Sequence, residues 1–509
     1  MERLVPHNSG YHLLKESIDA RRRHDIHRVV SVEVFGPDEK IPVRDIKLPK
    51  INYSGEKPLI IGAGPAGLFA ALRFVERGIP CKLFERGSTA EKRLIAINRF
   101  WRYGELNPED NVCFGEGGAG LYSDGKLMTR IKSPHIPYIM RRLVEFGAPE
   151  EIEYLANPHV GSDRIRRIIP VLRKYLIANG CEFFFNTKVE DLLMEEKQIT
   201  GLKTSDGTLH HSPHVILATG HSAKDIFHML HKNGVELVGK SFALGLRVEH
   251  PQKLINSIQY RGHADHPKLG SANYKLTHFD EKTKVGTYSF CMCPGGYILS
   301  SGTDADGIVC NGMSNYHRNS PFANSGIVVS IDYEKNFGKD IFAGLEFQHS
   351  LEKACKDAVT RVGGTKQLPA QKTMDFLNSK TSDELLKSST PSGISSVDFN
   401  KILPPFLVKA LKEGLANFAQ KMPGFDGATS QLHGIESRTS SPLRVPRNPE
   451  TFESTSHQGL YPVGEGAGYA GGITSAAADG INAAEAIMQV LSSQTAEREN
   501  TKPLPEKSV

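Results

Sequence analysis

The stretch that decides the fold is Pro58-Leu59-Ile60-Ile61-Gly62-Ala63-Gly64-Pro65-Ala66-Gly67. The apolar run that ends at Ile61 is typical of a buried parallel strand, and the apolar residues after Gly67 recur at helical spacing. A strand, a glycine turn and a helix in this order form the phosphate-binding part of a dinucleotide site. We therefore predict a βαβ unit whose second strand covers residues 81–85.

Each glycine of this turn has its own expected task. Gly62 lets the chain turn sharply, Gly64 lets backbone N–H groups approach a pyrophosphate, and Gly67 lets the helix pack closely on the strand. The phosphates would then lie at the positive end of that helix. Glu85 follows about 20 residues later, where a carboxylate accepts hydrogen bonds from an adenosine ribose.

A second glycine turn near the end of the chain favours FAD over NAD. Gly464-Glu465-Gly466 follows a short apolar strand, and Gly471-Gly472-Ile473 opens an alanine-rich helix. In flavoproteins of the glutathione reductase class, such a segment places an acid near the ribityl chain and a helix N-terminus near the flavin ring. Glu465 and the backbone of Gly472 and Ile473 would have these positions, and the helix end would stabilise an anionic reduced flavin.

The segment from Phe114 to Lys126 is rich in glycine and has few apolar residues to bury. Backbone of this kind lies against something flat or charged, and the FAD pyrophosphate and ring are the expected partners. Val189 would offer its backbone to the adenine, and the strand that ends at Thr219 and Gly220 would pass near the pyrophosphate. The full set of expected FAD contacts is Gly62, Gly64, Pro65, Ala66, Gly67, Glu85, Arg86, Arg93, Gly117, Gly118, Lys126, Val189, Thr219, Gly220, Gly464, Glu465, Gly472 and Ile473, and no metal site is expected.

Composition limits the class of protein. The chain has 509 residues with 39% hydrophobic content, enough for two or three domains. It has neither an apolar run of about 18 residues nor the apolar core of a signal peptide. A formal charge of +5 with dispersed basic residues argues weakly for nucleic acid. Seven cysteines without regular spacing fit a reducing cytoplasm.

We expect an α/β protein with a Rossmann-like FAD-binding domain, an inserted mixed α/β substrate domain and a small N-terminal α/β appendage. The appendage covers residues 1–52, with a helix from the apolar residues 13, 14 and 18 to the basic run 21–23, and a strand over 30–34. The FAD-binding domain covers 53–240 and 431–491, and the inserted domain covers 241–430. Residues 379–398 are expected to be an exposed connection, and 492–509 a disordered tail.

Several motifs beyond the glycine turns resemble one known family. They are Phe114-Gly115-Glu116-Gly117-Gly118-Ala119-Gly120 with Ser123-Asp124-Gly125-Lys126, Pro158-His159-Val160-Gly161-Ser162-Asp163, Gly220-His221-Ser222-Ala223, Cys291-Met292-Cys293-Pro294-Gly295-Gly296, Glu436-Ser437-Arg438-Thr439-Ser440-Ser441-Pro442 and Gly464-Glu465-Gly466-Ala467-Gly468-Tyr469-Ala470-Gly471-Gly472. The chain resembles, over almost its whole length, the uncharacterised FAD-dependent dehydrogenases of bacteria and plastids, often described as NAD(FAD)-utilising dehydrogenases. Lys224 and Ser162 stand where this family would have arginine and threonine. The resemblance implies FAD and a redox role, but no particular substrate.

Glu436 and Arg438 are the candidate catalytic residues because they shortly precede the C-terminal flavin segment. Arg438 could hold a substrate carboxylate with two hydrogen bonds, and Glu436 or the nearby His433 could move a proton as hydride passes to the flavin. The alternative is a salt bridge that ties two domains together. The sequence leaves both open.

Cys291 and Cys293 suggest a redox dithiol, but their spacing favours structural thiols. Disulfide reductases of the glutathione reductase type carry their cysteines on the helix after the first glycine turn, where this chain has no such pair. A disulfide that spans one residue is strained, and Cys310 does not complete the spacing of a zinc site. Redox or substrate contact remains the second interpretation.

The preferred function is an FAD-dependent oxidoreductase that exchanges a hydride between flavin and an unidentified small organic substrate. Because the region after Gly220 offers no second complete βαβ unit, NAD(P)H would bind transiently or act through a redox partner protein. The alternatives are an NAD(P)H-fed flavin reductase or monooxygenase, an RNA-associated flavoprotein that uses Arg21-Arg22-Arg23, and a flavin-bound scaffold without turnover. Binding to nucleic acid or to a membrane is not expected.

Overall fold

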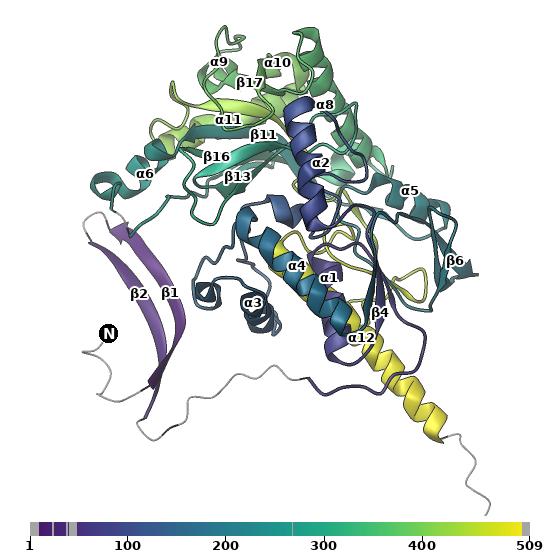
Figure 1. Cartoon of the computed structure of the whole chain (residues 1–509). Helices are drawn as coiled ribbons and strands as arrows, with labels where there is room; N and C mark the ends of the chain where they lie inside the picture. Colours follow the sequence, from purple (N-terminus) through teal and green to yellow (C-terminus); the bar gives the residue numbers. More distant parts are fainter. Residues whose placement is uncertain (1–9, 23–24, 37–38, 40–47, 267, 501–509) are drawn as a thin grey trace, which may run out of the picture.

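The computed structural model describes residues 10–22, 25–36, 39, 48–266 and 268–500. Two α/β units make up its body, a nucleotide-binding unit with a parallel sheet and a second unit around a large mixed sheet (Figure 1). The second unit interrupts the first in sequence, so the expected α/β fold with an inserted domain is confirmed.

The nucleotide-binding unit contains a five-stranded sheet in the order β21-β9-β3-β4-β5. All pairings between its strands are parallel. The central strands carry fully buried apolar side chains, which is the pattern of parallel strands covered on both faces. The strands are β3 (Leu59–Ile61), β4 (Cys81–Phe84), β5 (Cys181–Phe184), β9 (Val215–Leu217) and β21 (Leu460–Pro462).

Helix α1 (Pro65–Glu76) begins directly after the first glycine turn, and α12 (Ile473–Asn500) packs along it. The expected disordered tail is wrong over residues 492–500, which continue α12, while 501–509 lie outside the described residues. The other helices of this unit are α2 (Ala90–Tyr103), α3 (Ile136–Glu145), α4 (Ser162–Ala178) and α5 (Lys224–Lys232), with short 3-10 turns η1 (Ala119–Tyr122) and η2 (Glu150–Glu153).

A three-stranded antiparallel meander follows β5, with a hairpin turn at Ser205-Asp206-Gly207 between its last two strands. Strand β5 ends at Phe184, and shortly after it Asn186 takes a left-handed conformation with φ 52°. The strands are β6 (Val189–Glu195), β7 (Gln198–Thr204) and β8 (Leu209–His211).

The inserted unit is built on a seven-stranded sheet in the order β12-β13-β16-β11-β19-β17-β18. Its strands are β11 (Phe242–Pro251), β12 (Thr277–Asp280), β13 (Val285–Cys293), β16 (Phe322–Ile331), β17 (Leu368–Lys372), β18 (Ile394–Ser396) and β19 (Gln431–Glu436). Two small ribbons accompany it, β10 (Val238–Gly239) with β20 (Leu443–Arg444) and β14 (Gly296–Ser300) with β15 (Cys310–Ser314). Its helices are α6 (Gln252–Tyr260), η3 (Arg261–His263), α7 (Tyr333–Phe337), α8 (Ala343–Arg361), α9 (Thr373–Leu377), α10 (Phe399–Ile402) and α11 (Pro405–Lys421).

Two expectations about the inserted unit need correction. The boundary expected after residue 430 falls too early, because β19 pairs with β11 and β17 inside the seven-stranded sheet. The segment 379–398 is not simply an exposed connection, since Ser382 and Ser392 are buried and β18 pairs with β17. Local polar composition predicted the exposed connection, but strand pairing draws this segment into the fold.

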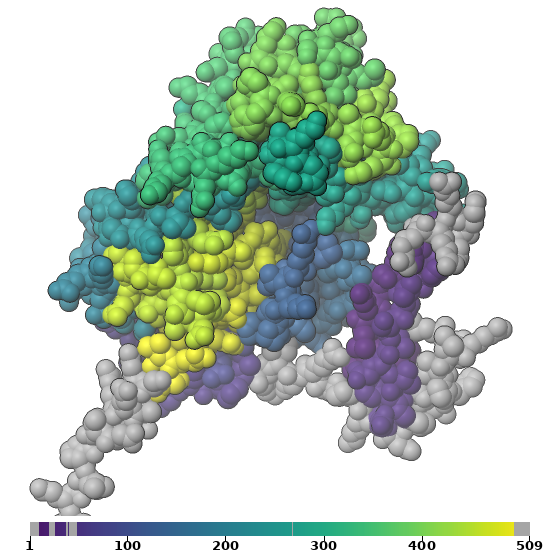
Figure 2. Space-filling view, turned by 180° about the vertical axis from the view of Figure 1, so that it is seen from behind, coloured from purple at the N-terminus to yellow at the C-terminus, as the bar shows by residue number. Residues whose placement is uncertain are grey.

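The N-terminal appendage is a β-hairpin of β1 (Gly10–Arg22) and β2 (Asp25–Phe35). The predicted strand over 30–34 is confirmed, and the helix over 13–23 is wrong because pairing with β2 decides the conformation. The hairpin stands at one side of the body, and a backbone bridge joins Glu16 to Leu155 (Figures 1 and 2). The side chains of the run 21–23 lie outside the described residues, so the alternative in which this run binds RNA stays untested.

Candidate functional site

The first glycine turn has the geometry that a bound pyrophosphate requires. Gly62 takes φ +103°, and an added Cβ would lie 2.4 Å from the carbonyl oxygen of Ala218. A Cβ on Gly67 would lie 2.0 Å from the carbonyl oxygen of Gly62, so the helix touches the turn. By contrast, a Cβ on Gly64 would meet only the Cα of Gly118, at 3.9 Å, so this position borders open space above the start of α1.

Three further segments surround this turn. Gly117 donates its N–H to the carbonyl oxygen of Ala63 at 2.8 Å, which fixes the 114–126 loop on the first turn. The half-buried residues Thr219 and Gly220 follow β9, and a Cβ on Gly466 would lie 2.4 Å from the carbonyl oxygen of Gly220. Backbone of four distant segments therefore converges here with few side chains between them.

Glu85 binds the backbone of this region through both carboxylate oxygens. Oε2 accepts the N–H of Ala63 at 2.8 Å, and Oε1 accepts those of Gly87 at 3.0 Å and Gly115 at 2.9 Å. The carboxylate thus stands at the end of β4, beside the turn, as expected for the ribose-binding acid. Oε1 already accepts two hydrogen bonds, and Oε2 can accept one more, as from a ribose hydroxyl.

Arg93 has an indirect role, contrary to the expected direct contact with FAD. Its fully buried guanidinium donates to the carbonyl oxygens of residues 111, 112, 115, 116 and 118. Because its N–H groups point at these carbonyls, Arg93 holds the glycine loop in shape and has little left to offer a phosphate. The guanidinium on α2 therefore satisfies carbonyl groups of the glycine-rich loop that a helix or strand would satisfy with backbone hydrogen bonds.

Arg86 and Val189 both lie close to α5. Arg86 pairs with Asp225 at 2.8 Å and with Glu109 at 3.4 Å, and its guanidinium lies over the ring of Phe114. Val189 begins β6 and lines a polar hollow of about 430 Å³ together with Asp225. The ion pairs of Arg86 draw the end of β4 towards α5 at this edge.

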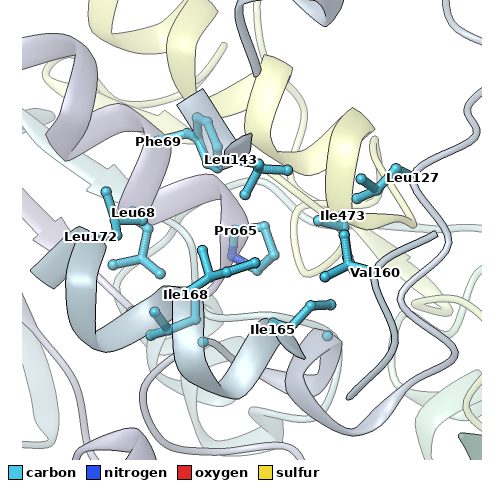
Figure 3. A pocket seen from close by; sticks show the side chains of 13 residues that line it. Pro65, Leu68, Phe69, Leu127, Leu143, Val160, Ile165, Ile168, Leu172 and Ile473 are labelled. Carbon is cyan, nitrogen blue, oxygen red and sulfur yellow. The ribbon is translucent and has the colours of Figure 1, made fainter. Parts of the chain in front are cut away.

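A small apolar cavity lies behind the first turn, between α1, α4 and the start of α12 (Figure 3). Pro65, Leu68, Ile168 and Ile473 are among the side chains that face it. Its volume of about 30 Å³ would admit little more than a water molecule, and its apolar walls offer such a water no partners. It is a packing gap and not the binding site of the cofactor.

The start of α12 faces the end of the glycine loop. Thr474 donates its hydroxyl to the carbonyl oxygen of Leu127 at 2.7 Å, directly after Lys126. Gly472 is exposed and Ile473 half-buried, so the first backbone N–H groups of α12 border a free space. Gly464 donates its N–H to Asp479 at 2.7 Å, which fixes the second turn on this helix. The positive end of α12 is therefore available to an electron-rich ring.

Glu465 and Lys126 both interact with Cys291 of β13, so they lie at the space where the two units meet. Burial raises the pKa of Glu465 to about 8, although the ammonium of Lys240 partly opposes this rise. Glu465 is consequently protonated at neutral pH and can donate a hydrogen bond. Lys126 keeps 33% of its side chain accessible and donates to the carbonyl oxygen of Met292 in β13. This space is therefore bounded by both units.

The two candidate catalytic residues are engaged in ion pairs. Glu436 binds the guanidinium of Arg247 through two hydrogen bonds of 2.8 and 2.9 Å, and both side chains are buried. Arg438 donates to both oxygens of Glu352, at 2.9 and 2.8 Å, and also to Thr303 and Asp304. These contacts are the salt-bridge alternative, although Glu352 and Asp304 belong to the inserted unit itself.

Asp304, His349 and Glu352 offer three ligand atoms within 4.8 Å of one another, as a metal site would need. Cations of the protein already balance these acids. Lys224 Nζ lies 2.9 Å from Asp304, and Arg438 Nη2 lies 2.8 Å from Glu352. The pKa of Glu352 is held far below its usual value by Arg438, so the cluster is an ion network that includes α5.

Three further groups lie near the junction; the sequence pointed to two of them through the family motifs and missed the third, Lys240. They are Lys240, the neutral His221 and the bulge of β13 at Cys291. Burial and the positive charge of Arg438 lower the pKa of His221 to about 4, so it carries no charge at neutral pH. The family motifs are the signal for His221 and Cys291, because motif residues without a structural task belong to sites.

The residues present fit FAD. The turn around Gly64 borders open space as a pyrophosphate would need, Glu85 keeps an acceptor site on Oε2 that a ribose hydroxyl could use, and the start of α12 is accessible to a flavin ring. FAD would supply a two-electron carrier at this junction. No helix within the described residues is long and apolar enough to cross a membrane.

Comparison with known proteins places the chain among flavoproteins. Residues 155–308 match the FAD dependent oxidoreductase family, and residues 241–439 match the FAD-dependent protein, C-terminal domain-like family. An uncharacterized protein of Clostridium beijerinckii is 40% identical over 494 residues, which cover 94% of this chain and 92% of that protein.

Similar solved structures include CtdE in complex with FAD, with 12% identity, a TM-score of 0.31 and coverage of 88% of this chain and 94% of that one. L-proline dehydrogenase from P. horikoshii has 12% identity and a TM-score of 0.33, with 87% and 95% covered. L-amino acid deaminase from Proteus vulgaris has 10% identity and a TM-score of 0.38, with 88% and 96% covered. From its family matches and its clostridial relative, the chain belongs to the FAD-dependent oxidoreductases.

Proposed function

We propose that this flavoprotein is a dehydrogenase whose organic substrate meets the flavin in the space between the glycine segments and the seven-stranded sheet. This agrees with its sequence resemblance to NAD(FAD)-utilising dehydrogenases. The observation that carries the proposal is the junction itself, where Glu465 and Lys126 from one unit face β13 of the other. A half-buried, protonated acid with the ammonium of Lys240 nearby suits a site in which a proton moves together with a hydride.

The residues of the chain would divide the work. The backbone around Gly64 and Gly118 holds the phosphates, and Glu85 holds the ribose. Glu465 keeps its proton at neutral pH and donates a hydrogen bond at the ring end, while the start of α12 stabilises negative charge there. Lys126 anchors the loop to β13 through Met292, which keeps the two walls of the space together.

A reductase or monooxygenase fed by NAD(P)H is the second candidate. The described residues contain one parallel sheet of more than two strands, the five-stranded sheet that carries the first glycine turn. A resident second dinucleotide would need a second sheet of this kind. We therefore place any nicotinamide in transient contact with the junction, or on a partner protein.

The test is an anaerobic absorption spectrum of the FAD-loaded protein before and after addition of NADH or NADPH. We expect the flavin band to persist with either nicotinamide and to bleach with metabolite fractions that contain the organic substrate. Rapid bleaching by NADPH or NADH, at a rate compatible with catalysis, would support the second candidate instead. A flavin that neither nicotinamide nor any fraction reduces, but that dithionite does, would contradict both.

A further inference from the structure

Strand β13 contains a bulge at the junction. Its register with β16 shifts between Phe290 and Cys293, so that Cys291 and Met292 lie opposite a single partner residue. Cys291 takes a left-handed conformation with φ 51°. Cysteine seldom adopts this conformation, and strained residues in bulges gather at functional sites. The strand therefore departs from regular pairing at the point where it meets the glycine loop.

Cation donors hold the bulge in place. Lys126 donates to the carbonyl oxygen of Met292, and Arg247 donates to that of Cys291 at 3.4 Å. The thiol of Cys293 lies 3.3 Å from the same carbonyl oxygen. Arg247 is itself held by its ion pair with Glu436. Glu436, the expected catalytic acid, therefore affects the bulge only through Arg247.

The two thiols of the bulge differ in character. A hydrogen bond from the Cys293 thiol lowers the pKa of Cys291 to about 6, with help from Lys126 and Arg247, while burial and Asp124 oppose this. The same pairing and burial raise the pKa of Cys293 well above its usual value. A thiolate beside a protonated thiol is the arrangement of an attacking cysteine with its partner.

The two thiols of the bulge also differ in their exposure to solvent. Cys293 is fully buried, whereas Cys291 is half-buried. Lys126, which faces Cys291, keeps a third of its side chain accessible, at 33%, and the charge of Cys291 contributes to the raised pKa of Glu465. Cys291 therefore borders the same space as Glu465. By contrast, burial raises the pKa of Cys310 and of Cys355, which have no contact with this space among the described interactions.

We propose that Cys291 and Cys293 form a redox-active dithiol that exchanges electrons with a disulfide-bearing substrate at the flavin junction. This rests on the proposed function and deepens it by naming the class of the electron acceptor: the organic substrate of the dehydrogenase reduces the flavin, and the disulfide takes up the electrons. Its attacking group is Cys291, and Cys293 is the partner that closes the intramolecular disulfide.

The exchange balances in two steps. The Cys291 thiolate attacks one sulfur of the substrate disulfide, a mixed disulfide forms, and the first substrate thiolate leaves. Cys293 then loses its proton and attacks the Cys291 sulfur, the second substrate thiolate leaves, and the Cys291–Cys293 bond forms. Two electrons have passed to the substrate. The two electrons that restore the dithiol come from the reduced flavin, which is the chemistry the cofactor supplies.

The short spacing of the pair is compatible with this role. Two residues of extended chain span at most about 7 Å, close to the upper limit of about 6.8 Å between the Cα atoms of a disulfide. A disulfide across one intervening residue would be strained. Strained disulfides are easily reduced and are typical of catalytic pairs and not of structural ones.

The first test traps the attacking cysteine. The Cys293→Ser variant is incubated with oxidised glutathione, and the modified residues are identified by mass spectrometry of a non-reducing digest. We expect a glutathione adduct on Cys291 in this variant, and a Cys291–Cys293 disulfide without an adduct in the wild-type protein. The half-buried Cys113 is the internal control. Modification of Cys291 no faster than that of Cys113 would overturn the proposal.

The second test counts electrons. The FAD-loaded protein is oxidised with oxidised glutathione, freed of the reagent and titrated anaerobically with dithionite. A flavin and a disulfide together take up about four electrons, and a flavin alone about two. We expect four in the wild-type protein and two in Cys291→Ser and Cys293→Ser. An uptake of two electrons by the wild-type protein would contradict the proposal.

The tests separate this proposal from the proposed function. Serine closely matches cysteine in size, so retained flavin absorbance shows that each variant is folded and loaded. If a metabolite fraction bleaches the flavin but Cys291 stays unmodified by oxidised glutathione, the dithiol proposal fails alone. If Cys291 is trapped but reduced flavin does not restore the dithiol, the coupling to the flavin fails.

Discussion

Arg247 and Glu436 face each other across neighbouring strands of the seven-stranded sheet, with Nε 2.8 Å from Oε2 and Nη2 2.9 Å from Oε1. The exposed fractions of their side chains are 0% and 3%. A carboxylate held in this way by a buried guanidinium serves mainly to neutralise that charge. Its removal should therefore lower the stability of the folded state, whatever it does to catalysis.

Glu436→Ala should lower the free energy of unfolding by about 3–5 kcal/mol, because it leaves Arg247 buried without a counter-charge. Urea unfolding followed by the fluorescence of Trp101, the single tryptophan, measures this. The control is Glu281→Ala, which breaks the exposed pair with Lys284 and should change little. Equal unfolding free energies of the two variants would show that the buried pair stabilises the protein no more than the exposed pair does.

Gly64→Val should abolish FAD binding without unfolding the protein. Gly64 has an ordinary φ of −78°, and an added Cβ would meet no atom closer than 3.9 Å, so a valine fits the fold but occupies the space for the pyrophosphate. The flavin absorbance of the purified variant measures this. Gly262→Val, at an exposed glycine with nothing within 4 Å, should remain yellow. A fully loaded Gly64→Val protein would disprove this binding site.

Glu465 should make the apoprotein less stable as the pH rises. Its pKa is raised from 4.5 to about 8 on folding, so the folded state binds more protons than the unfolded state between these values. The contribution is complete below pH 4.5 and is lost as the pH rises through about 8. Urea unfolding between pH 5 and 9 should show a loss of a few kcal/mol, on the order of 1.4 per pH unit at most.

The Glu465→Gln variant provides the control for this pH dependence. Glutamine cannot ionise, so the unfolding free energy of this variant should be flatter over the same pH range. An equally steep decline in the variant would assign the pH dependence to other groups.

Lys126→Met should make Cys291 less reactive near neutral pH. In the wild-type protein the rate of alkylation by iodoacetamide should rise with a midpoint near pH 6, the pKa of Cys291. Loss of the nearby ammonium should move this midpoint upwards by about one pH unit. Lys126→Arg should restore it, and the exposed Lys132→Met should leave it unchanged. An unchanged midpoint in Lys126→Met would mean that Lys126 does not contribute and that the hydrogen bond from Cys293 alone lowers the pKa of Cys291.

The sequence predicted the nucleotide-binding unit well because its signals are local. The turn at Gly62, the strand before it and the helix after it lie within 20 residues, and backbone sterics alone demand glycine there. The second turn at Gly464 is equally local. Its position beside the first turn follows from the parallel pairing of β21 with β9 and of β9 with β3.

What the sequence could not predict depends on partners far along the chain. The counter-ion of Glu436 lies 189 residues away, and that of Arg438 lies 86 away. Arg93 looks like a phosphate ligand until the carbonyls that surround it are known. The sequence predicts a helix where β1 forms, because the spacing of its apolar residues does not reveal the pairing with β2.

Helix α12 starts beside the space for the flavin ring and continues for 28 residues to Asn500, past the edge of the body (Figure 1). At 1.5 Å per residue its far end is about 40 Å from Gly472. A dye attached there would be held away from the cofactor at a nearly fixed distance. It could report by energy transfer whether flavin is bound, in any variant, without touching a residue of the site.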